Sequence, residues 1–230
     1  GLPVPNPGAP VYRDTNGSPR GVTVVGNYAY VADYYSGLAI IDISDPASPG
    51  APVYRDTNGF AWDVTVVGNY AYVADRASGL AIIDISDPAV PVAIGDLDTT
   101  GSAYDVTVVG NYAYVADGDS GLAIINISDP AVPVAIGDMD TTGRALGVTV
   151  VGNYAYVADS DSGLAIIDIT DPTSPGTPVY RDTNGFAYDV TVVGNYAYVA
   201  DNSSGLAIID ISDPAIPGTP VYKDTSGYAY

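Results

Sequence analysis

The sequence predicts an all-β fold, a five-bladed β-propeller built from 42-residue repeats of four strands each. The segment VTVVGNYAYVAD recurs at constant 42-residue spacing, and the repeats start near Val22, Val64, Val106, Val148 and Val190. No window has the periodicity of an amphipathic helix. Four short strands in about 40–45 residues are typical of propeller blades. Residues 1–230 are therefore expected to form a single domain.

The first repeat shows how each strand is predicted. Residues 22–25 are short and apolar, and Gly26-Asn27 is a two-residue hairpin signal with glycine first, as a type II′ turn prefers. Residues 28–33 and 38–44 form the next two strands. Asp45-Pro46 ends the third strand because proline cannot pair in a ladder. Residues 51–59 form the fourth, outer strand.

Both faces of each predicted sheet are apolar. In the second strand, Tyr28, Tyr30 and Ala32 share one face, whereas Ala29 and Val31 share the other. A four-stranded sheet with two apolar faces is marginal by itself, and neighbours on both sides are needed to cover it. The sequence therefore predicts blades that pack against one another around an axis.

The composition excludes several classes of function. The chain has no Cys and no His, and its 27 acidic residues, all of them Asp, outnumber seven Lys and Arg for a net charge of −20. Such a charge argues against nucleic acids and anionic membranes as partners, and it favours cations or neutral, sugar-like ligands. No apolar run is long enough for a transmembrane helix, so no membrane insertion is expected.

The outer-strand sequence occurs six times, once more than the other three strands. Terminal outer strands are predicted at residues 10–17 and 219–227, and one of them is spare. The spare strand either packs loosely on the surface or adds to the open edge of a neighbouring molecule, which would make fibres. The residues of these self-assembly strands are Val11, Tyr12, Val221 and Tyr222. A third alternative is that the chain is an excerpt of a longer array, and ring closure within one chain stays open.

The repeated segments AYVAD, SGLAIIDISDP and PVYRDT or PVAIGDLDT resemble LVIVD repeats, a propeller-forming family of bacterial and archaeal surface proteins. The resemblance extends from about Ala9 to Tyr230. It implies a propeller fold and an extracellular or cell-surface location. It implies no reaction, because the family has no shared catalytic motif to transfer to these positions.

Two repeats carry an Asp-x-Asp-Ser-Gly pattern, which is the start of a typical Ca²⁺ loop. The residues are Asp117 and Asp119, and Asp159 and Asp161. The bidentate Glu that completes such a loop is missing, so the alternative is an Asx-type turn followed by glycine. Ca²⁺ is the only cofactor that the pattern leaves open. Glycosylation sequons begin at Asn16, Asn126 and Asn202.

Candidate ligand-binding residues lie where the blades should surround a channel. Asp63, Asp105 and Asp189 precede the first strand in three repeats, and a ring of carboxylates there would hold a cation or sugar hydroxyls. The alternative is that they bond to nearby backbone amides. Tyr34 and Tyr35 replace small or polar residues in a variable loop, where they are expected to be exposed.

The sequence thus favours a non-enzymatic extracellular structural protein that self-assembles, with the fibre as the form that outer-strand donation would produce. The alternative function is a lectin-like or adhesive propeller that binds glycans through blade-top loops or the acidic channel mouth. No enzyme is expected, because every Asp recurs within the repeat and a catalytic constellation usually appears once.

Overall fold

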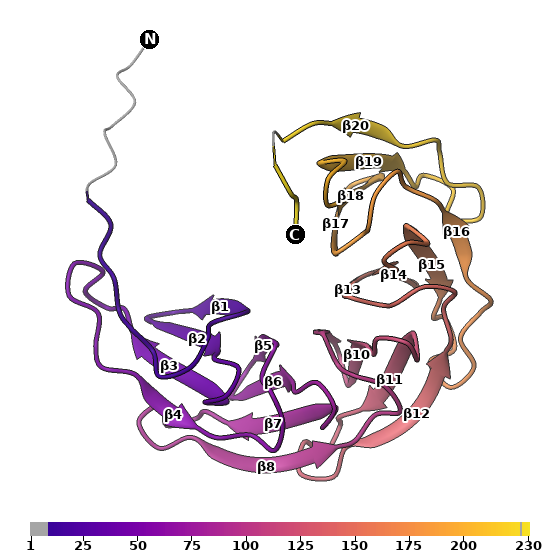
Figure 1. Ribbon diagram of the computed structural model, residues 1–230. Coiled ribbons are helices and arrows are strands. Elements are labelled where there is room, and N and C mark those ends of the chain that lie inside the picture. Colours follow the sequence, from indigo (N-terminus) through magenta and orange to yellow (C-terminus); the bar gives the residue numbers. More distant parts are fainter. Residues whose placement is uncertain (1–8, 226) are drawn as a thin grey trace.

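The computed structural model describes residues 9–225 and 227–230 and confirms the predicted all-β propeller fold (Figure 1). Twenty strands form five separate antiparallel sheets of four, and the strands of each sheet are in chain order. We call these sheets blades 1 to 5. Among the described residues, no helix has the length and hydropathy that crossing a membrane requires.

The blades have almost the same strand boundaries. Blades 1 and 2 consist of β1 (Val22–Val25), β2 (Tyr28–Ala32), β3 (Leu38–Asp42), β4 (Val53–Arg55), β5 (Asp63–Val67), β6 (Tyr70–Ala74), β7 (Leu80–Asp84) and β8 (Val92–Leu97). Blade 3 consists of β9 (Asp105–Val109), β10 (Tyr112–Ala116), β11 (Leu122–Asn126) and β12 (Val134–Met139). Blades 4 and 5 consist of β13 (Gly147–Val151), β14 (Tyr154–Ala158), β15 (Leu164–Asp168), β16 (Val179–Arg181), β17 (Asp189–Val193), β18 (Tyr196–Ala200), β19 (Leu206–Asp210) and β20 (Val221–Lys223).

The hairpin turn of each repeat has the expected geometry, and the outer strand is shorter than expected. Val25 pairs with Tyr28, and Gly26 between them has a φ of 57°, as the first residue of a type II′ turn requires. The outer strand β4 covers three residues of the predicted 51–59. Pro52 has no N–H to donate, and Thr57 and Gly59 bond to the next blade instead.

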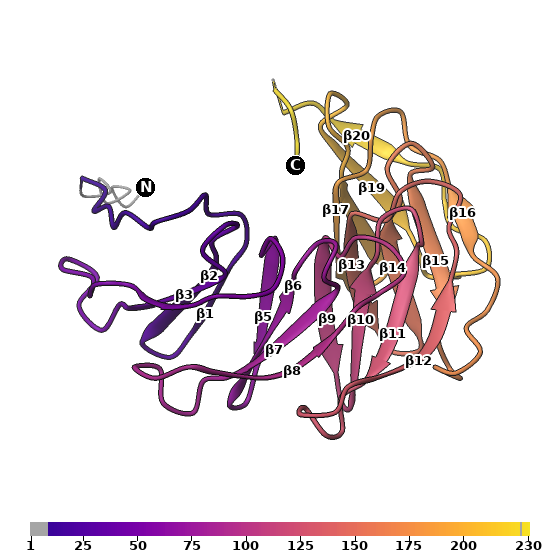
Figure 2. The same cartoon turned by 60° about the horizontal axis from the view of Figure 1, so that its bottom comes forward.

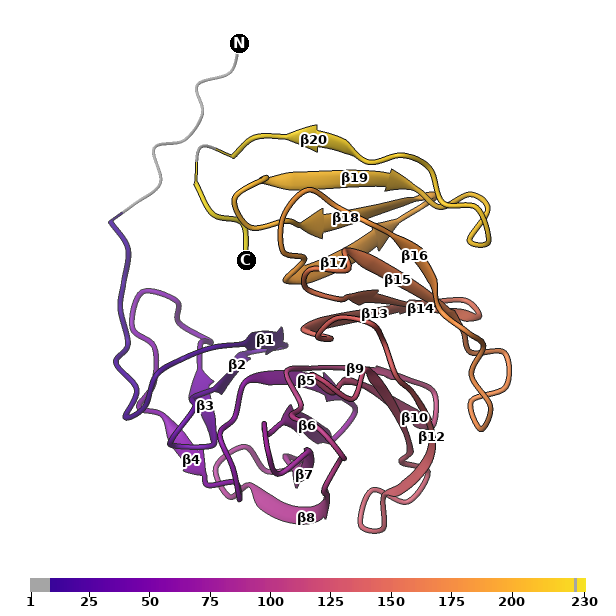
Figure 3. The same cartoon turned by 45° about the vertical axis from the view of Figure 1, so that its right-hand side comes forward.

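The blades form an arc with the first strands inside and the outer strands on its circumference (Figure 1). Figure 2 shows the sheets of blades 2 to 4 standing side by side, and Figure 3 shows a gap that separates blade 1 from blade 5. The ring is therefore open in this structure, although its five blades are those that the sequence predicts.

The core consists of four equivalent interfaces between blades. Each blade has a leading face, which meets the next blade, and a trailing face, which meets the previous one. In the first interface, the leading face of blade 1 contributes Tyr30, Leu38 and Ile40, and the trailing face of blade 2 contributes Val64 and Ile83. Equivalent clusters join the remaining neighbours. Full burial of each aliphatic side chain contributes about 1.5–3 kcal/mol, so these interfaces dominate the stability.

The two end faces of the arc have no neighbouring blade. On the trailing face of blade 1, Val31, Ala39 and Ile41 are still buried in a smaller cluster, but Val22 and Val24 of β1 are 63% and 58% exposed, whereas Val64 of blade 2 is 1% exposed. On the leading face of blade 5, Leu206 is only half-buried, whereas Leu38 of blade 1 is fully buried. The arc thus exposes part of each half of the interface that it repeats internally.

A buried aspartate ties each blade to the preceding outer segment. Asp75 is fully buried, and it accepts a hydrogen bond from the Thr57 hydroxyl at 2.7 Å and another from the Gly59 amide at 2.7 Å. The Asx-type alternative expected this carboxylate to cap its own turn, but the carboxylate of Asp75 bonds to Thr57 and Gly59 instead. That turn is closed by the backbone, where the Ser78 amide donates to the Asp75 carbonyl. The other blades repeat this bond through Asp33, Asp117, Asp159 and Asp201.

The N-terminal segment occupies the place of an outer strand from a preceding blade. Thr15 and Gly17 donate to Asp33, and the Arg13 guanidinium donates to the Pro49 carbonyl. Arg181 makes the same contact with Pro217. However, residues 10–17, expected to be a strand, pair with no strand in the described part of the chain. In a closed ring, this segment would pair with the edge of β19 in blade 5, but β19 is already paired with β20.

Replacement of the buried carboxylate should destabilise the fold. Asp117→Ala removes the acceptor for Thr99 and Gly101, and we expect the free energy of unfolding to decrease by about 2–3 kcal/mol. The measurement is urea denaturation followed by circular dichroism. Asp161→Ala, at an exposed loop position, is the control and should change stability by less than about 0.5 kcal/mol. Equal effects of the two variants would refute the structural role of the buried carboxylate.

Candidate binding site at the channel mouth

The repeats differ most at one edge of the blades, around the open centre of the arc. One variable position lies just before each first strand and holds Arg20, Trp62, Tyr104, Leu146 and Tyr188. The other follows each buried aspartate and holds Tyr34, Arg76, Gly118, Ser160 and Asn202. We call the region formed by these residues, together with Arg144 two positions before Leu146, the mouth. A nearly constant scaffold therefore carries different side chains at one place.

Backbone geometry brings the two variable positions together. Arg76 has a φ of 55°, its amide donates to the Ala103 carbonyl at 3.1 Å, and the Ala103 amide donates back at 2.9 Å. This bridge places Arg76 of blade 2 beside Tyr104, which leads into blade 3. Gly118 adopts the same left-handed conformation without strain, but a residue with a side chain loses about 1–2 kcal/mol there. The mouth thus holds large side chains in a strained conformation.

Arginine and aromatic side chains alternate along the mouth. The Arg20 guanidinium carbon lies 5.1 Å from the ring centroid of Tyr34 and 4.6 Å from that of Trp62. The Arg76 guanidinium carbon lies 4.6 Å from the Trp62 centroid and 4.2 Å from that of Tyr104. Arg144 follows at 4.8 Å from Tyr104 and also donates to the Tyr104 hydroxyl. Each exposed cation–π contact contributes about 0.5–1 kcal/mol, so this ladder is preorganised.

Two of the predicted aspartates meet beneath the ladder. Asp105 accepts hydrogen bonds from the amides of Val106 and Val148, each at 2.7 Å. The carboxyl groups of Asp63 and Asp105 lie close enough for their charges to interact. Burial and the neighbouring Asp63 raise the pKa of Asp105 well above its usual value. Burial also raises the pKa of Asp63, although its hydrogen bonds oppose this effect.

Glycine replaces aspartate where a neighbouring blade needs the space. A Cβ atom on Gly21 would lie 2.2 Å from Oδ1 of Asp63, and one on Gly147 would lie 2.9 Å from Cα of Asp189. A side chain at either position would therefore require the neighbouring aspartate to shift.

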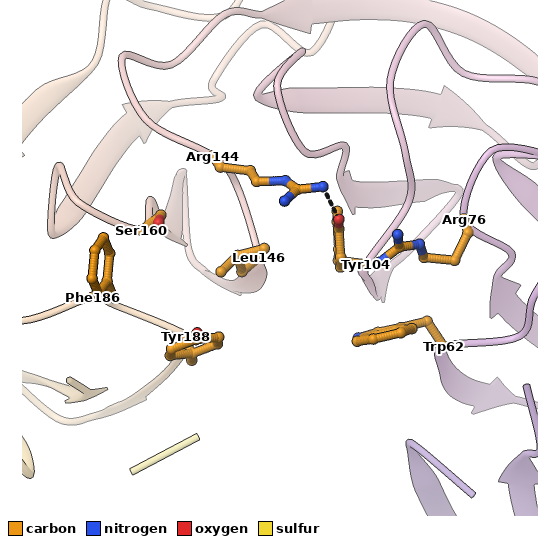
Figure 4. Close-up of a pocket in the computed structure, with 8 residues that line it drawn as sticks. All are labelled: Trp62, Arg76, Tyr104, Arg144, Leu146, Ser160, Phe186 and Tyr188. Carbon is orange, nitrogen blue, oxygen red and sulfur yellow. Dashed lines mark hydrogen bonds between the residues drawn. The ribbon is translucent and has the colours of Figure 1, made fainter. Parts of the chain in front are cut away.

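Two adjoining cavities open at the mouth, with volumes of about 490 and 460 Å³. Trp62, Tyr104, Leu146 and Tyr188 line both. Figure 4 shows the aromatic walls with Arg76 and Arg144 beside them, and Asp63, Asp105 and Asp189 line the second cavity. This size is within the range of small-molecule sites.

The structure gathers most of the predicted ligand-binding residues. Asp63, Asp105 and Asp189 line the same cavity, and Asp189 accepts a hydrogen bond from its neighbour's amide, as the alternative interpretation expected. Tyr34 belongs to the ladder. Tyr35 is 65% exposed and lies at the rim, with its ring centroid 4.3 Å from that of Tyr34.

The predicted metal residues do not converge. Asp117 and Asp159 are buried and bond to the preceding outer segment, whereas Asp119 and Asp161 are exposed. Asp119 lies 3.6 Å from Nε of Arg144. Within residues 9–225 and 227–230, no cluster of three or more potential metal ligands is present. A Ca²⁺ site therefore stays a prediction.

The remaining predicted residues lie far apart. Asn16 is exposed, Asn126 is half-buried within β11 and accepts a bond from Ser128, and Asn202 is half-buried with a φ of 47°. Among the self-assembly residues, Val11, Tyr12 and Val221 are 53%, 81% and 66% exposed, and Tyr222 is half-buried.

Sequence reasoning assigned no binding role to Trp62, Arg76, Tyr104, Arg144 or Tyr188. The signal that identifies them is present in the sequence, because they occupy the columns in which otherwise near-identical repeats differ. Their mutual contacts depend on the bridges between blades and therefore required the structure.

The LVIVD repeat model matches five segments, residues 16–52, 58–99, 100–141, 142–179 and 184–220. No curated protein sequence matches the chain. The family match covers most of the molecule, and its five segments correspond to the five blades.

Solved structures similar to this chain share its fold at low sequence identity. The computationally designed Ika8 protein has a TM-score of 0.69 and 10% identity, over 92% of this chain and 62% of its own. The β-propeller domain of Cps50 (Swd1) from Myceliophteria thermophila has a TM-score of 0.67 and 11% identity, over 91% of this chain and 72% of its own. A Bacteroides uniformis protein provisionally assigned as a 6-phosphogluconolactonase has a TM-score of 0.72 and 16% identity, over 89% of this chain and 68% of its own. The chain thus spans 62–72% of the lengths of these proteins.

The raised pKa values of Asp63 and Asp105 predict a pH dependence of stability. A carboxyl whose pKa is raised by folding stabilises the folded state below its unfolded pKa of about 3.9, and this contribution is lost as pH rises through the folded pKa. The free energy of unfolding should therefore decrease as the pH rises above about 4. In Asp105→Asn, the side chain at this position no longer titrates, so the decrease should be smaller.

Urea denaturation at several pH values measures this difference. Asp129→Asn, at an exposed turn position, is the control and should behave as the parent protein does. An Asp105→Asn profile parallel to that of the parent would show that folding does not raise the pKa of Asp105.

Proposed function

This chain belongs to the LVIVD repeat family, and from that premise we propose that it is a non-enzymatic extracellular scaffold protein that assembles head to tail. The single observation that carries the proposal is the exposure of both end faces of the arc. Each of them is one half of an interface that the chain already makes four times. A second copy of the chain is therefore the partner of matching shape and chemistry.

The proposed contact places the trailing face of blade 1 on the leading face of blade 5 of another copy. Val22 and Val24 would then become buried as Val64 is, against Leu206 and Ile208 of the neighbour. Burial of the exposed parts of these two valines alone contributes about 2–4 kcal/mol before the cost of association. Since this contact is heterologous, repetition gives a closed ring or an open superhelical fibre, depending on the rotation between copies.

The outer strands fit the same assembly. In a joined pair, the N-terminal segment of one copy and β20 of the other would compete for the edge of β19. The sequences PVYRDTNG and PVYKDTSG are nearly identical, so either can bond there. In strand donation, residues 10–17 of one copy would displace β20 of the other copy from the edge of its β19.

The non-enzymatic character is supported by the roles of the aspartates. Asp75 and its equivalents bond to the neighbouring outer segment, and Asp105 bonds to backbone amides. The family resemblance supports the proposed extracellular or cell-surface location. A net charge of −20 keeps such a protein soluble and opposes contact between copies at low ionic strength.

The alternative function, a lectin-like or adhesive propeller, is favoured by a different observation. The mouth combines cavities of ligand size with aromatic, cationic and carboxyl side chains. This function does not compete with assembly, because the mouth and the end faces use different residues.

A charge on the end face should prevent assembly. Val24→Asp places a carboxylate on the proposed contact, and we expect the variant to stay at 23.5 kDa under conditions in which the parent protein forms larger species. The measurement is sedimentation velocity over a range of protein concentrations, with negative-stain microscopy of the largest species. Assembly of the parent should increase with added salt because repulsion between copies is screened.

Val25→Asp is the matched control. It adds the same charge on the same strand, but Val25 points to the other face and is 44% exposed, as are Val67 and Val151. It should therefore assemble as the parent does. A parent protein that stays monomeric at high concentration would exclude the proposal, as would equal assembly of the two variants.

Deletion of residues 1–12 separates face packing from strand donation. If donated strands hold the copies together, the deletion should abolish assembly, because Val11 and Tyr12 are lost. If the end faces suffice, assembly should persist, since Thr15 and Gly17 still bond to Asp33. Sedimentation of the truncated chain distinguishes the two, and unchanged assembly would exclude strand donation.

A further inference from the structure

The arginines of the mouth expose their hydrogen-bonding edges. Stacking on ring faces uses the flat face of a guanidinium and leaves its N–H groups free to bond in the plane. Within the described part of the chain, neither Arg20 nor Arg76 makes a side-chain hydrogen bond. The Arg144 side chain is 47% exposed and meets only Tyr104 and Asp119 by hydrogen bond or ion pair. These planar donors match the geometry of a carboxylate.

The charge at the mouth differs from that of the rest of the molecule. Arg20, Arg76 and Arg144 are three of the seven basic residues in a chain of net charge −20. The many aspartates elsewhere repel a long polyanion, but a short anionic ligand can approach the three guanidiniums at short range. The mouth therefore favours a compact anionic ligand.

The walls and floor indicate the rest of the ligand. Arginines cover the ring faces of Trp62 and Tyr104. Tyr188 lines both cavities and presents an aromatic surface on which a flat ring with C–H groups can pack. Asp105 and Asp189 line the second cavity, and their carboxyl oxygens, which already accept backbone amides, have further lone pairs for ligand hydroxyls. A ligand that satisfies both has an apolar ring face and hydroxyl groups along its edge.

We propose that the mouth binds a uronic acid residue of a glycan, with its carboxylate on Arg76 and the neighbouring arginines, its pyranose face on Tyr188, and its hydroxyls toward the aspartates. This inference rests on the alternative function given above, binding at the mouth, and names its ligand class. It is independent of assembly. An aromatic carboxylate shares the charged end and the flat ring but lacks the hydroxyls.

The single tryptophan makes the site directly observable. Trp62 is the only Trp in the chain, so its fluorescence reports on the mouth alone. The full chain is titrated with trigalacturonic acid, with its uncharged methyl ester and with benzoate, and calorimetry provides a second measurement. Trigalacturonic acid should change the emission, and the methyl ester should bind about tenfold more weakly or worse, because a charge-assisted hydrogen bond is lost.

Arg76→Gln should weaken binding of trigalacturonic acid by about tenfold or more. Arg55→Gln is the matched control. It makes the same change of charge in β4, outside the mouth, and should bind as the parent does. Circular dichroism of both variants checks that they fold.

Each of the other outcomes would contradict one specific part of the proposal. If the methyl ester binds as tightly as the acid, or if Arg76→Gln has no effect, the acidic ligand class is wrong although the mouth still binds sugars. If benzoate binds as tightly as trigalacturonic acid, the assignment to a saccharide is wrong. If no probe gives a fluorescence or calorimetric signal at about 10 mM, the inference and the underlying binding function both fail.

Discussion

Packing of one blade against the next is the interaction on which this structure depends. Each sheet is apolar on both faces, so a blade is stable only where neighbours cover it. Four such contacts bury Leu38, Val64 and their equivalents almost completely. At the ends of the arc, Val22 is the equivalent of Val64, and Leu206 is the equivalent of Leu38, yet both remain accessible. The repeated packing therefore leaves one trailing face and one leading face without a neighbouring blade.

Constant and variable positions of the repeats have different roles. Constant residues build the blades and join them through buried carboxylates such as Asp75. Variable residues collect at the mouth, where the left-handed position of Arg76 and the bridge to Ala103 bring side chains of adjacent blades into contact. A site made in this way changes without any change in the core. Assembly through the end faces and binding at the mouth are consequently separate properties of one scaffold.

The blade count, the strand order and the type II′ turn followed from the sequence because they depend on local pattern and constant spacing. The partner of the buried aspartates did not, since Thr57 lies far from Asp75 in the chain and meets it only when blades stack. The three predicted carboxyls Asp63, Asp105 and Asp189 were located correctly by their position before the first strand. The arginine–aromatic ladder was missed because its contacts join different blades. The open ring and the hydrogen bonds of residues 15–17 to blade 1 could not be predicted either, because they also depend on tertiary packing.

Hydrogen exchange as a function of protein concentration tests the central claim most directly. At low concentration, the amides of β1 and β2 should exchange faster than those of β9 and β10, because the trailing face of blade 1 is uncovered and local opening there needs less energy. At high concentration, the two sets should become equally protected as end faces meet. Equal protection of β1 and β9 at every concentration would contradict the account, since it would mean that a single chain already covers the end faces.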